Sequence, residues 1–268
     1  MTTRQKLKQD KEIIIKLYKE GKDPVHISKE LGYKYCQPIY NLLIKENLYQ
    51  SSDPKIRFKA RKYSVDENFF ENIDTEYKAY ILGFIVADGH VSDHSIVIAL
   101  NEKDIDILEK IKIAMKSTHV IKYFIKDNKY KHVVLKINSI KLVAQLRRFG
   151  ILKNKSTTIG NVMQYVPSKY QISFLRGYFD GDGNIFYGVT YSSGTKYIIT
   201  VIGTEEFLKT SFNKIFKTNC KIAKYKSCNM YSWKISKKSQ VDSFLDIIYK
   251  DASIYLNRKY KSDHIKSY

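Results

Sequence analysis

One short pattern occurs twice and constrains the fold more than any other feature of the chain. It reads ILGFIVADG at 81–89 and LRGYFDGDG at 175–183. Residues four positions apart lie on one face of a helix, and small residues at that spacing let two helices approach closely. Each copy carries such a pair: Gly83 with Ala87, and Gly177 with Gly181. We therefore expect the two motif helices to pack against each other.

The segments that follow each copy are also repeated. Strand-like segments, a charged amphipathic helix, a second hairpin and a further helix come after both motifs, which is the sequence signature of a tandem repeat. The order αββαββα is thus predicted twice, over 74–165 and 166–268. The predicted fold class is α+β, with two tandem repeats that pack on each other.

Each motif helix is expected to end at an aspartate, Asp88 in the first copy and Asp182 in the second. A helix C-terminus is already negative, and two carboxylates brought together there repel each other, so a cation should lie between them. Hard oxygen ligands without histidine or cysteine favour Mg²⁺, and Mn²⁺ or Ca²⁺ can occupy the same site. Divalent ions beside a basic surface indicate phosphodiester hydrolysis. The alternative is that both Asp-Gly pairs are simply glycine helix caps, but two matching occurrences favour a site.

The charge of the chain points to a polyanionic partner. It has 47 Lys and Arg against 27 Asp and Glu, a net charge of +20, together with 22 Tyr and 13 Phe. Such a composition suits nucleic acid, although an anionic membrane surface or biased composition would give the same excess. No apolar run of about 18 residues and no cleavable signal is found, so we expect a soluble intracellular protein, cytoplasmic or organellar, that binds no membrane.

Three cysteines show no zinc-ligand spacing: Cys36, Cys220 and Cys228.

Residues 1–50 are predicted to form three short helices. Asp23 can cap the second of them, Pro24 suits its first turn, and Gly32 ends it. The layout is that of a helix-turn-helix module, whose last helix enters the major groove, and the alternative is an ordinary three-helix packing unit. The residues expected to face DNA are Lys34, Gln37, Tyr40, Asn41 and Lys45.

A basic linker is predicted over 51–73, where the hydrophobic periodicity weakens. It can follow a phosphate backbone or lie in a minor groove, or it is only a solvated tether. Its candidate DNA contacts are Lys55, Arg57, Lys59, Arg61 and Lys62. In the first repeat, Lys122 and Lys126 are expected to reach DNA from a strand, but the sequence does not decide which sheet face meets the duplex.

The two motifs resemble the signature helices of the LAGLIDADG homing endonucleases in their single-chain, two-motif form. The resemblance covers about residues 74–261 and includes NEKDIDILEKI, LRRFGILKNKS and DASIYLNRKYK. It implies a monomer in which the two αββαββα repeats are related by a pseudo-twofold axis and their two antiparallel sheets form a saddle over the DNA major groove. It also implies metal-dependent cutting of both strands at a long asymmetric target. By this resemblance Asp88 and Asp182 are the catalytic, metal-binding acids. Lys136 and Lys234 correspond to the basic residue that ends the fourth strand of each repeat.

Some positions depart from the family pattern. Val86 replaces an acid in the first copy, and Arg176 and Gly181 replace alanine in the second. Asp180 is expected to be a supporting acid rather than a ligand, and His90 a surface residue. Two further interpretations stay open: an intron maturase that binds its host intron RNA, and a DNA-binding regulator that does not cut. No intein splicing residues frame the chain, which disfavours a protein-splicing element.

Overall fold

The computed structural model describes residues 3–49, 62–126, 130–152, 159–190, 194–225 and 229–260. The chain divides into two compact units at the boundary between Lys62 and Tyr63. Among the residues described, no helix has both the length and the apolar content needed to span a membrane.

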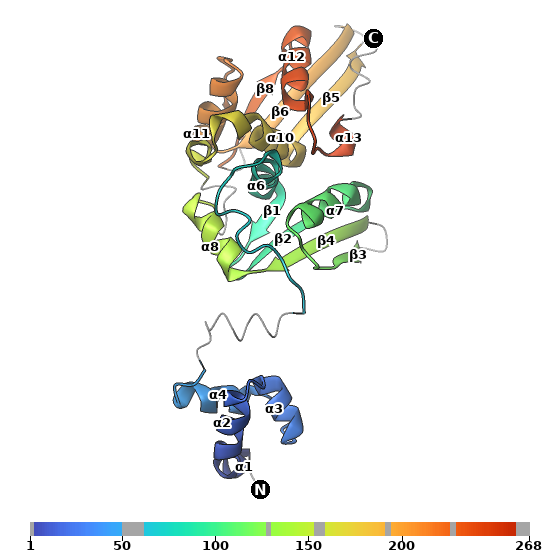
Figure 1. The fold of residues 1–268 in the computed structure, drawn as a ribbon. Helices are drawn as coiled ribbons and strands as arrows, with labels where there is room; N and C mark the ends of the chain where they lie inside the picture. Colours follow the sequence, from blue (N-terminus) through green and yellow to red (C-terminus); the bar gives the residue numbers. More distant parts are fainter. Residues whose placement is uncertain are drawn as a thin grey trace. The chain divides into compact units, whose positions relative to one another are not determined.

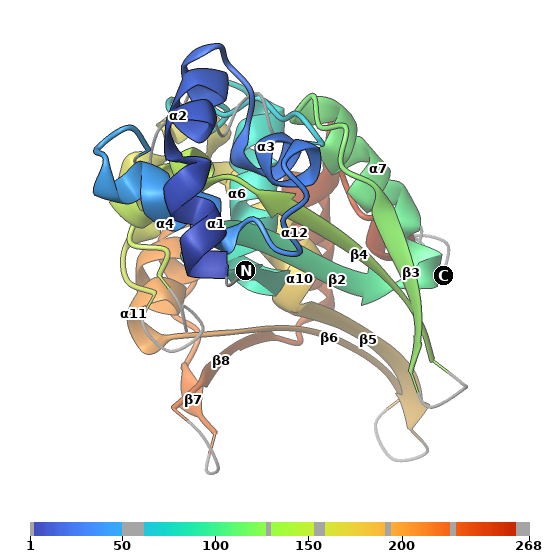
Figure 2. The ribbon, with the colours of Figure 1, turned by 90° about the horizontal axis from the view of Figure 1, so that it is seen from below.

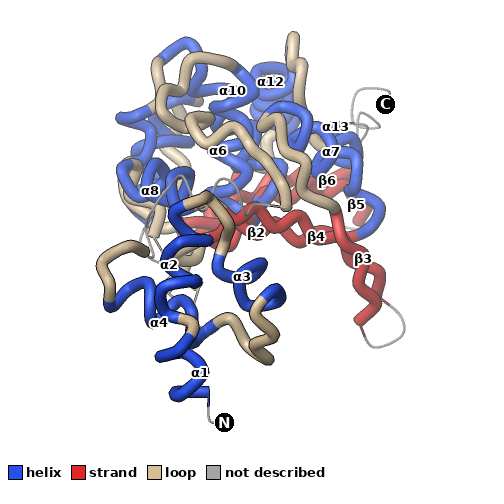
Figure 3. Tube along the Cα trace, turned by 60° about the horizontal axis from the view of Figure 1, so that its bottom comes forward, coloured by secondary structure: helices blue, strands red, loops and turns tan. Residues whose placement is uncertain are grey.

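The first unit is helical (Figure 3). Its helices are α1 (Thr3–Gln9), α2 (Lys11–Lys19), α3 (Pro24–Glu30) and α4 (Gln37–Lys45). Its small core consists of Ile14, Ile27, Ile39 and Leu43, all fully buried. The structure therefore adds one helix, α1, to the three predicted. Asp10 separates α1 from α2, and its side chain accepts a hydrogen bond of 2.9 Å from the Tyr33 hydroxyl instead of capping α2.

The predicted limits of the second of those three helices are confirmed. The Asp23 carboxylate accepts hydrogen bonds from the backbone N–H groups of Val25 and His26, and Pro24 occupies the first turn. Gly32 follows the helix with a φ of +66°, a conformation that L side chains rarely adopt.

The second unit consists of two αββαββα repeats (Figures 1 and 3), which confirms the predicted order. The first repeat contains α6 (Glu76–Asp88), β1 (Gly89–Val91), β2 (Ser95–Asn101), α7 (Ile105–Ala114), β3 (Ile121–Lys126), β4 (Tyr130–Asn138) and α8 (Ile140–Arg148). The second contains α10 (Gln171–Asp182), β5 (Gly183–Thr190), β6 (Gly194–Gly203), α11 (Glu205–Leu208) with a π-helical turn after it, β7 (Ala223–Lys224), β8 (Tyr231–Ile235) and α12 (Lys238–Tyr249). A last short helix is α13 (Asn257–Tyr260).

Each repeat forms one antiparallel four-stranded sheet. The strand orders are β1-β2-β4-β3 and β5-β6-β8-β7, so the two sheets have the same topology. The pair α6 and α10 lies between the two sheets (Figure 1), and β5 and β6 curve along their length (Figure 2). Alternate strand residues, such as Ile96 and Ile98 or Ile199 and Val201, are buried on one face of each sheet in a common core.

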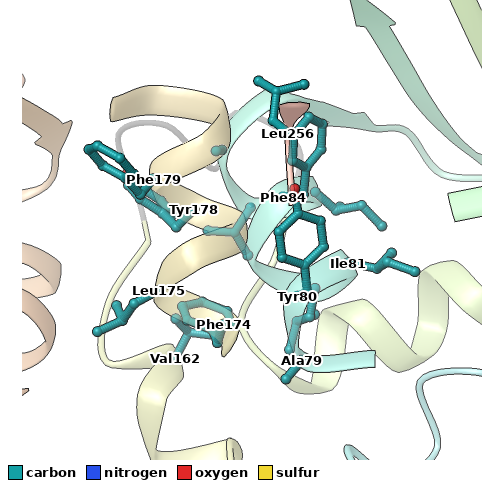
Figure 4. Close-up of a cluster of buried hydrophobic side chains, with 14 of the residues drawn as sticks. Ala79, Tyr80, Ile81, Phe84, Val162, Phe174, Leu175, Tyr178, Phe179 and Leu256 are labelled. Atoms are coloured by element: carbon teal, nitrogen blue, oxygen red, sulfur yellow. The ribbon is translucent and has the colours of Figure 1, made fainter. Parts of the chain in front are cut away.

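Small residues bring α6 and α10 together, as the motif predicts. A Cβ on Gly83 would lie 2.0 Å from the Phe174 carbonyl oxygen, and one on Gly177 would lie 2.0 Å from that of Tyr80. Both distances are too short for any side chain, so the helices touch through their backbones. Figure 4 shows buried aromatic and aliphatic side chains around this contact, among them Tyr80 and Phe84 of α6 and Phe174 and Tyr178 of α10.

The prediction that the linker extends to residue 73 is wrong. The structure places Phe69, Phe70 and Ile73 in the core of the second unit, each at most 5% exposed. Gln145 holds this segment: its side-chain oxygen accepts from the Phe70 N–H at 3.1 Å and its amide donates to the Glu67 carbonyl at 2.9 Å. These contacts span more than 70 residues, which a weak local periodicity does not indicate. Residues 51–61 of the linker lie outside the described residues.

Candidate active site

Asp88 and Asp182 are the last residues of α6 and α10. Asp88 is exposed and Asp182 is half-buried. A Cβ on Gly181 would lie 3.4 Å from the Asp88 carboxyl carbon, so the Asp88 carboxyl stands beside the residue that precedes Asp182. The structure thus brings the two predicted acids to neighbouring helix ends.

Tyr178 lies close enough to respond to both acids. It is almost completely buried in α10, and its hydroxyl donates to the Ile202 carbonyl at 2.7 Å. Burial raises the pKa of Tyr178 well above its usual value, and the charge of Asp182, a hydrogen bond with Asp182 and the charge of Asp88 act in the same direction. The negative charges of Asp88 and Asp182 therefore both raise the pKa of the same residue, Tyr178.

Gly89 and Gly183 occupy the C-cap positions of α6 and α10, and their N–H groups donate to the Ile85 and Phe179 carbonyls. They do not adopt the left-handed conformation of the usual glycine cap. Gly89 has φ −74° and ψ 139°, and Gly183 has φ −85° and ψ 152°, so both are extended and begin β1 and β5. Glycine is needed here for space: a Cβ on Gly89 would lie 2.7 Å from the Ile85 carbonyl oxygen, and one on Gly183 would lie 2.1 Å from the Phe179 ring. Each acid thus stands at an abrupt change from helix to strand.

The two candidate lysines occupy equivalent positions in the two sheets. Lys136 pairs with Val97, which pairs with His90 on β1. Lys234 pairs with Thr200, which pairs with Asn184 on β5. His90 and Asn184 each stand two residues after a motif aspartate. β1 and β5, which carry them, begin directly after the two aspartates, and each lysine lies two strands away from that strand in its sheet. Both lysines are exposed.

One face of each sheet is not covered by the described helices of the second unit. Its residues are partly or fully exposed and include His90, Val97, Ala99, Lys122, Phe124, Val134 and Lys136 in the first sheet, and Asn184, Phe186, Lys196, Ile198, Thr200 and Lys234 in the second. This resolves which face is available to a ligand. The Lys122 side chain lies on it, whereas the side chain of Lys126 falls outside the described residues.

Asp180 has no access to solvent and forms a buried polar cluster. Its carboxylate accepts from the Tyr80 and Tyr249 hydroxyls at 2.6 Å each and from the Leu256 N–H at 2.7 Å. Burial raises the pKa of Asp180, against these hydrogen bonds and the charge of Lys259, which lower it. Asp180 therefore supports the end of α10 and does not face a ligand, as expected.

Sequence reasoning assigned no role to Lys259, which lies behind the end of α10. Its ammonium donates to the carbonyls of Phe179, Asp180, Gly181 and Gly183 at 2.6, 2.8, 3.3 and 2.5 Å. Burial lowers the pKa of Lys259 to about 8, against the nearby charges of Asp180, Asp88 and Asp182, which raise it. The only signal in the sequence was the segment DASIYLNRKYK, whose family resemblance does not indicate this contact.

The donors at the two helix ends fit a small hard cation. Among the residues that the structure describes, no group of three or more His, Cys, Asp or Glu side chains is placed to hold a metal ion. Mg²⁺, however, usually binds one or two carboxylates and completes its shell with water and substrate phosphates. Asp88 and Asp182 match that requirement.

In the first unit, the residues predicted to face DNA are accessible on α4 and the turn before it. Lys34, Gln37, Asn41 and Lys45 are exposed, and Tyr40 is half-buried with its ring 5.0 Å from that of Tyr49. Gln37 donates to the Asn41 side-chain oxygen at 3.0 Å. Of the predicted linker contacts, Lys62 is exposed, and the others lie outside the described residues: Lys55, Arg57, Lys59 and Arg61.

Comparison with solved structures supports the fold assignment. The second unit's architecture is similar to I-LtrWI, a LAGLIDADG homing endonuclease bound to target DNA, with a TM-score of 0.53, 13% identity and coverage of 73% of this chain and 89% of that one. The LAGLIDADG meganuclease I-AabMI bound to uncleaved DNA has a TM-score of 0.50 and 16% identity, covering 72% and 89%. I-SmaMI bound to an uncleaved DNA target with calcium ions has a TM-score of 0.50 and 12% identity, covering 72% and 90%.

Sequence comparison adds one partial match. A DNA polymerase of Acanthamoeba polyphaga mimivirus is 28% identical in an alignment 137 residues long, and the match covers 44% of this chain and 7% of the polymerase. The chain therefore corresponds to a small part of that protein. No protein-family model matches the chain.

Proposed function

We propose that this chain, which has the fold of the LAGLIDADG homing endonucleases, is a site-specific endonuclease that hydrolyses both strands of a DNA duplex with a divalent metal. The observation that carries the proposal is the meeting of Asp88 and Asp182 at adjacent helix ends. Like charges so placed favour a divalent cation, and the open sheet faces on either side carry lysines for phosphate. The solved neighbours with this fold were bound to DNA.

Each residue then has a definite task. Asp88 and Asp182 would hold the divalent metal, and each carboxylate would serve the cutting of one strand, with Mg²⁺ as the first choice and Ca²⁺ or Mn²⁺ as substitutes. When bound, the metal supplies charge stabilisation at the attacked phosphate and activates water. Lys136 and Lys234 would each orient one scissile phosphate by a charge-assisted hydrogen bond. Exposed residues of the open faces would read base edges and exclude water around the duplex.

The helical first unit would extend the contact with DNA. Its exposed Lys34, Gln37, Asn41 and Lys45 suit phosphate and base contacts of a helix-turn-helix type. Lys62 and the basic residues that precede it in the sequence would add phosphate contacts. The expected partner is therefore a long asymmetric duplex site bound by one copy of the chain.

The test begins with selection of cleaved sites from a randomised DNA library in the presence of Mg²⁺. On a selected site, Asp88→Asn and Asp182→Asn should each abolish double-strand cleavage and leave the dissociation constant almost unchanged. Asp246→Asn, which changes an exposed carboxylate on α12, is the matched control and should cut like the unmodified chain. Chelation of the metal should stop cutting reversibly. Cleavage at the original rate by either motif variant would reject the mechanism, and binding without cutting by the unmodified chain would identify a regulator.

A further inference from the structure

Residues 253–260 cross both motif helices and are tied to them by polar side chains. The Ser253 hydroxyl donates to the Glu76 carboxylate in the first turn of α6 at 2.6 Å. The Leu256 N–H donates to Asp180 near the end of α10, and Figure 4 shows Leu256 beside the Tyr80 side chain that binds the same carboxylate. This segment therefore reaches the contact between the two repeats, far along the chain from either motif.

Within this segment, Lys259 places its ammonium at the backbone around Asp182. Its four acceptors include the carbonyls of Gly181 and Gly183, the residues on either side of that acid. The last carbonyls of a helix have no partner within the helix, and a cation there also offsets the negative end of the helix dipole. The side chain is only 7% exposed, and its ammonium lies 5.2 Å from the centre of the Phe179 ring.

The location of these bonds distinguishes Lys259 from a general anchor. The adjoining Arg258 already joins the segment to the first repeat through Asp104 at 3.1 Å, and Lys110 donates to the Tyr255 carbonyl at 3.2 Å. Fastening the segment does not require a buried ammonium at the helix end. Lys259 instead satisfies the carbonyls of the turn at which α10 becomes β5.

We propose that Lys259 is a positioning residue for the reaction, because it holds the helix-to-strand turn that carries Asp182 and so sets the place of this carboxylate against its DNA strand. The inference rests on the proposed nuclease function. Without the ammonium, the carbonyls around Asp182 are deprived of a buried donor, and the turn must rearrange to reach water or other donors. Displacement of a reacting group by about 1 Å can cost about 100-fold in rate.

The decisive variant is Lys259→Met, which retains length and apolar character but removes the ammonium. The two DNA strands are labelled separately, and the strand served by Asp182 is identified as the one whose cutting Asp182→Asn slows more. Lys259→Met should cut that strand about 10- to 100-fold more slowly, leave the other strand near its original rate, and accumulate nicked duplex. Lys250→Met, which removes an exposed lysine just after α12, should leave both rates unchanged.

Hydrogen–deuterium exchange supplies a readout that needs neither metal nor DNA. In Lys259→Met, amides at 179–185 should exchange faster, whereas amides at 84–90, around the end of α6, should exchange as before. Unchanged exchange at 179–185 would overturn the inference, as would equal rates or equal slowing on both strands. If Lys259→Met does not fold, Lys259→Arg serves in its place, because it retains the charge. It should slow the same strand selectively, but by a smaller factor. Equal slowing of both strands by Lys259→Arg would also overturn the inference.

The two proposals can fail separately. If the unmodified chain cuts no DNA, the proposed nuclease function is rejected, and the positioning role of Lys259 in the reaction is rejected with it even when exchange at 179–185 changes. If the unmodified chain cuts and the Lys259 variants show no strand preference, only the positioning role is rejected.

Discussion

Gly83 of α6 lies directly against the Phe174 carbonyl of α10, because a Cβ on this glycine would stand 2.0 Å from that oxygen. Gly177 meets the Tyr80 carbonyl of α6 at the same distance, so the contact is reciprocal. A pair of helices that touch through their backbones has almost no freedom to slide or rotate. The ends of the helices, and the acids on them, are held by this contact.

Gly83→Ala should therefore destabilise the second unit. The added methyl group meets backbone atoms, which cannot move aside as a flexible side chain would, and overpacking of this kind costs about 1–3 kcal/mol or more. Gly160→Ala is the control, because its Cβ would meet only the Glu206 carboxylate, at 3.4 Å. Denaturant unfolding measures both, and equal stability of Gly83→Ala and the unmodified chain would contradict the close contact.

Tyr80→Phe should change how stability depends on pH. Burial raises the pKa of Tyr80 well above 10, and the charge of Asp180 and the hydrogen bond to it add to this. The folded state therefore keeps a proton that the unfolded state releases, so the contribution of Tyr80 is complete below pH 10 and is lost as the pH rises above it. The variant should be less stable at pH 8, by about 1.5–3 kcal/mol for a hydrogen bond to a charged group.

In denaturant unfolding, the difference in unfolding free energy between Tyr80→Phe and the unmodified chain should begin to narrow at about pH 10, the ordinary tyrosine pKa, and should keep narrowing as the pH rises further. Tyr77→Phe is the control, because Tyr77 is 40% exposed in the same helix. A difference that stays constant above about pH 10 would show that the Tyr80 hydroxyl is not held as a buried donor.

Lys136→Met and Lys234→Met should each slow the cutting of a different strand. Their equivalent places in the two sheets assign one lysine to each half of the site, and removal of one preorganised group that stabilises transition-state charge costs about 100-fold or more in rate. Lys196→Met removes a lysine from the same open face and should weaken binding without changing the rate at saturating DNA. Strand-resolved cleavage kinetics measure all three, and slowing of both strands by either variant would contradict the assignment.

The double substitution Lys34→Ala and Lys45→Ala should weaken DNA binding and make it less sensitive to salt. Removing one lysine that binds a phosphate lowers the slope of log affinity against log salt by about 1, so we expect a decrease of about 2. Lys16→Ala with Lys19→Ala changes the charge equally on exposed positions of α2 and should leave the slope closer to the original. Binding titrations at several salt concentrations decide the matter, and equal effects of the two pairs would reject α4 as the DNA-facing helix.

Local patterns predicted much of the architecture. The paired motifs and the alternation of strands and helices are short-range signals, since residues four apart share a helix face and residues two apart share a sheet face. The Asp23 cap and the αββαββα order followed from such signals alone. The linker end was placed wrongly because Phe69 and Phe70 are buried by partners far along the chain.

The sequence by itself thus determined the repeat, the close approach of the motif helices and the two acids at their ends. Only the tertiary structure decided which sheet face stays open, that Gly89 and Gly183 cap the helices in an extended conformation, and that Lys259 holds the turn around Asp182. The physical reason is distance along the chain. Lys259 meets its carbonyl acceptors across 76 to 80 residues, and a contact of that range leaves no periodic pattern in the sequence.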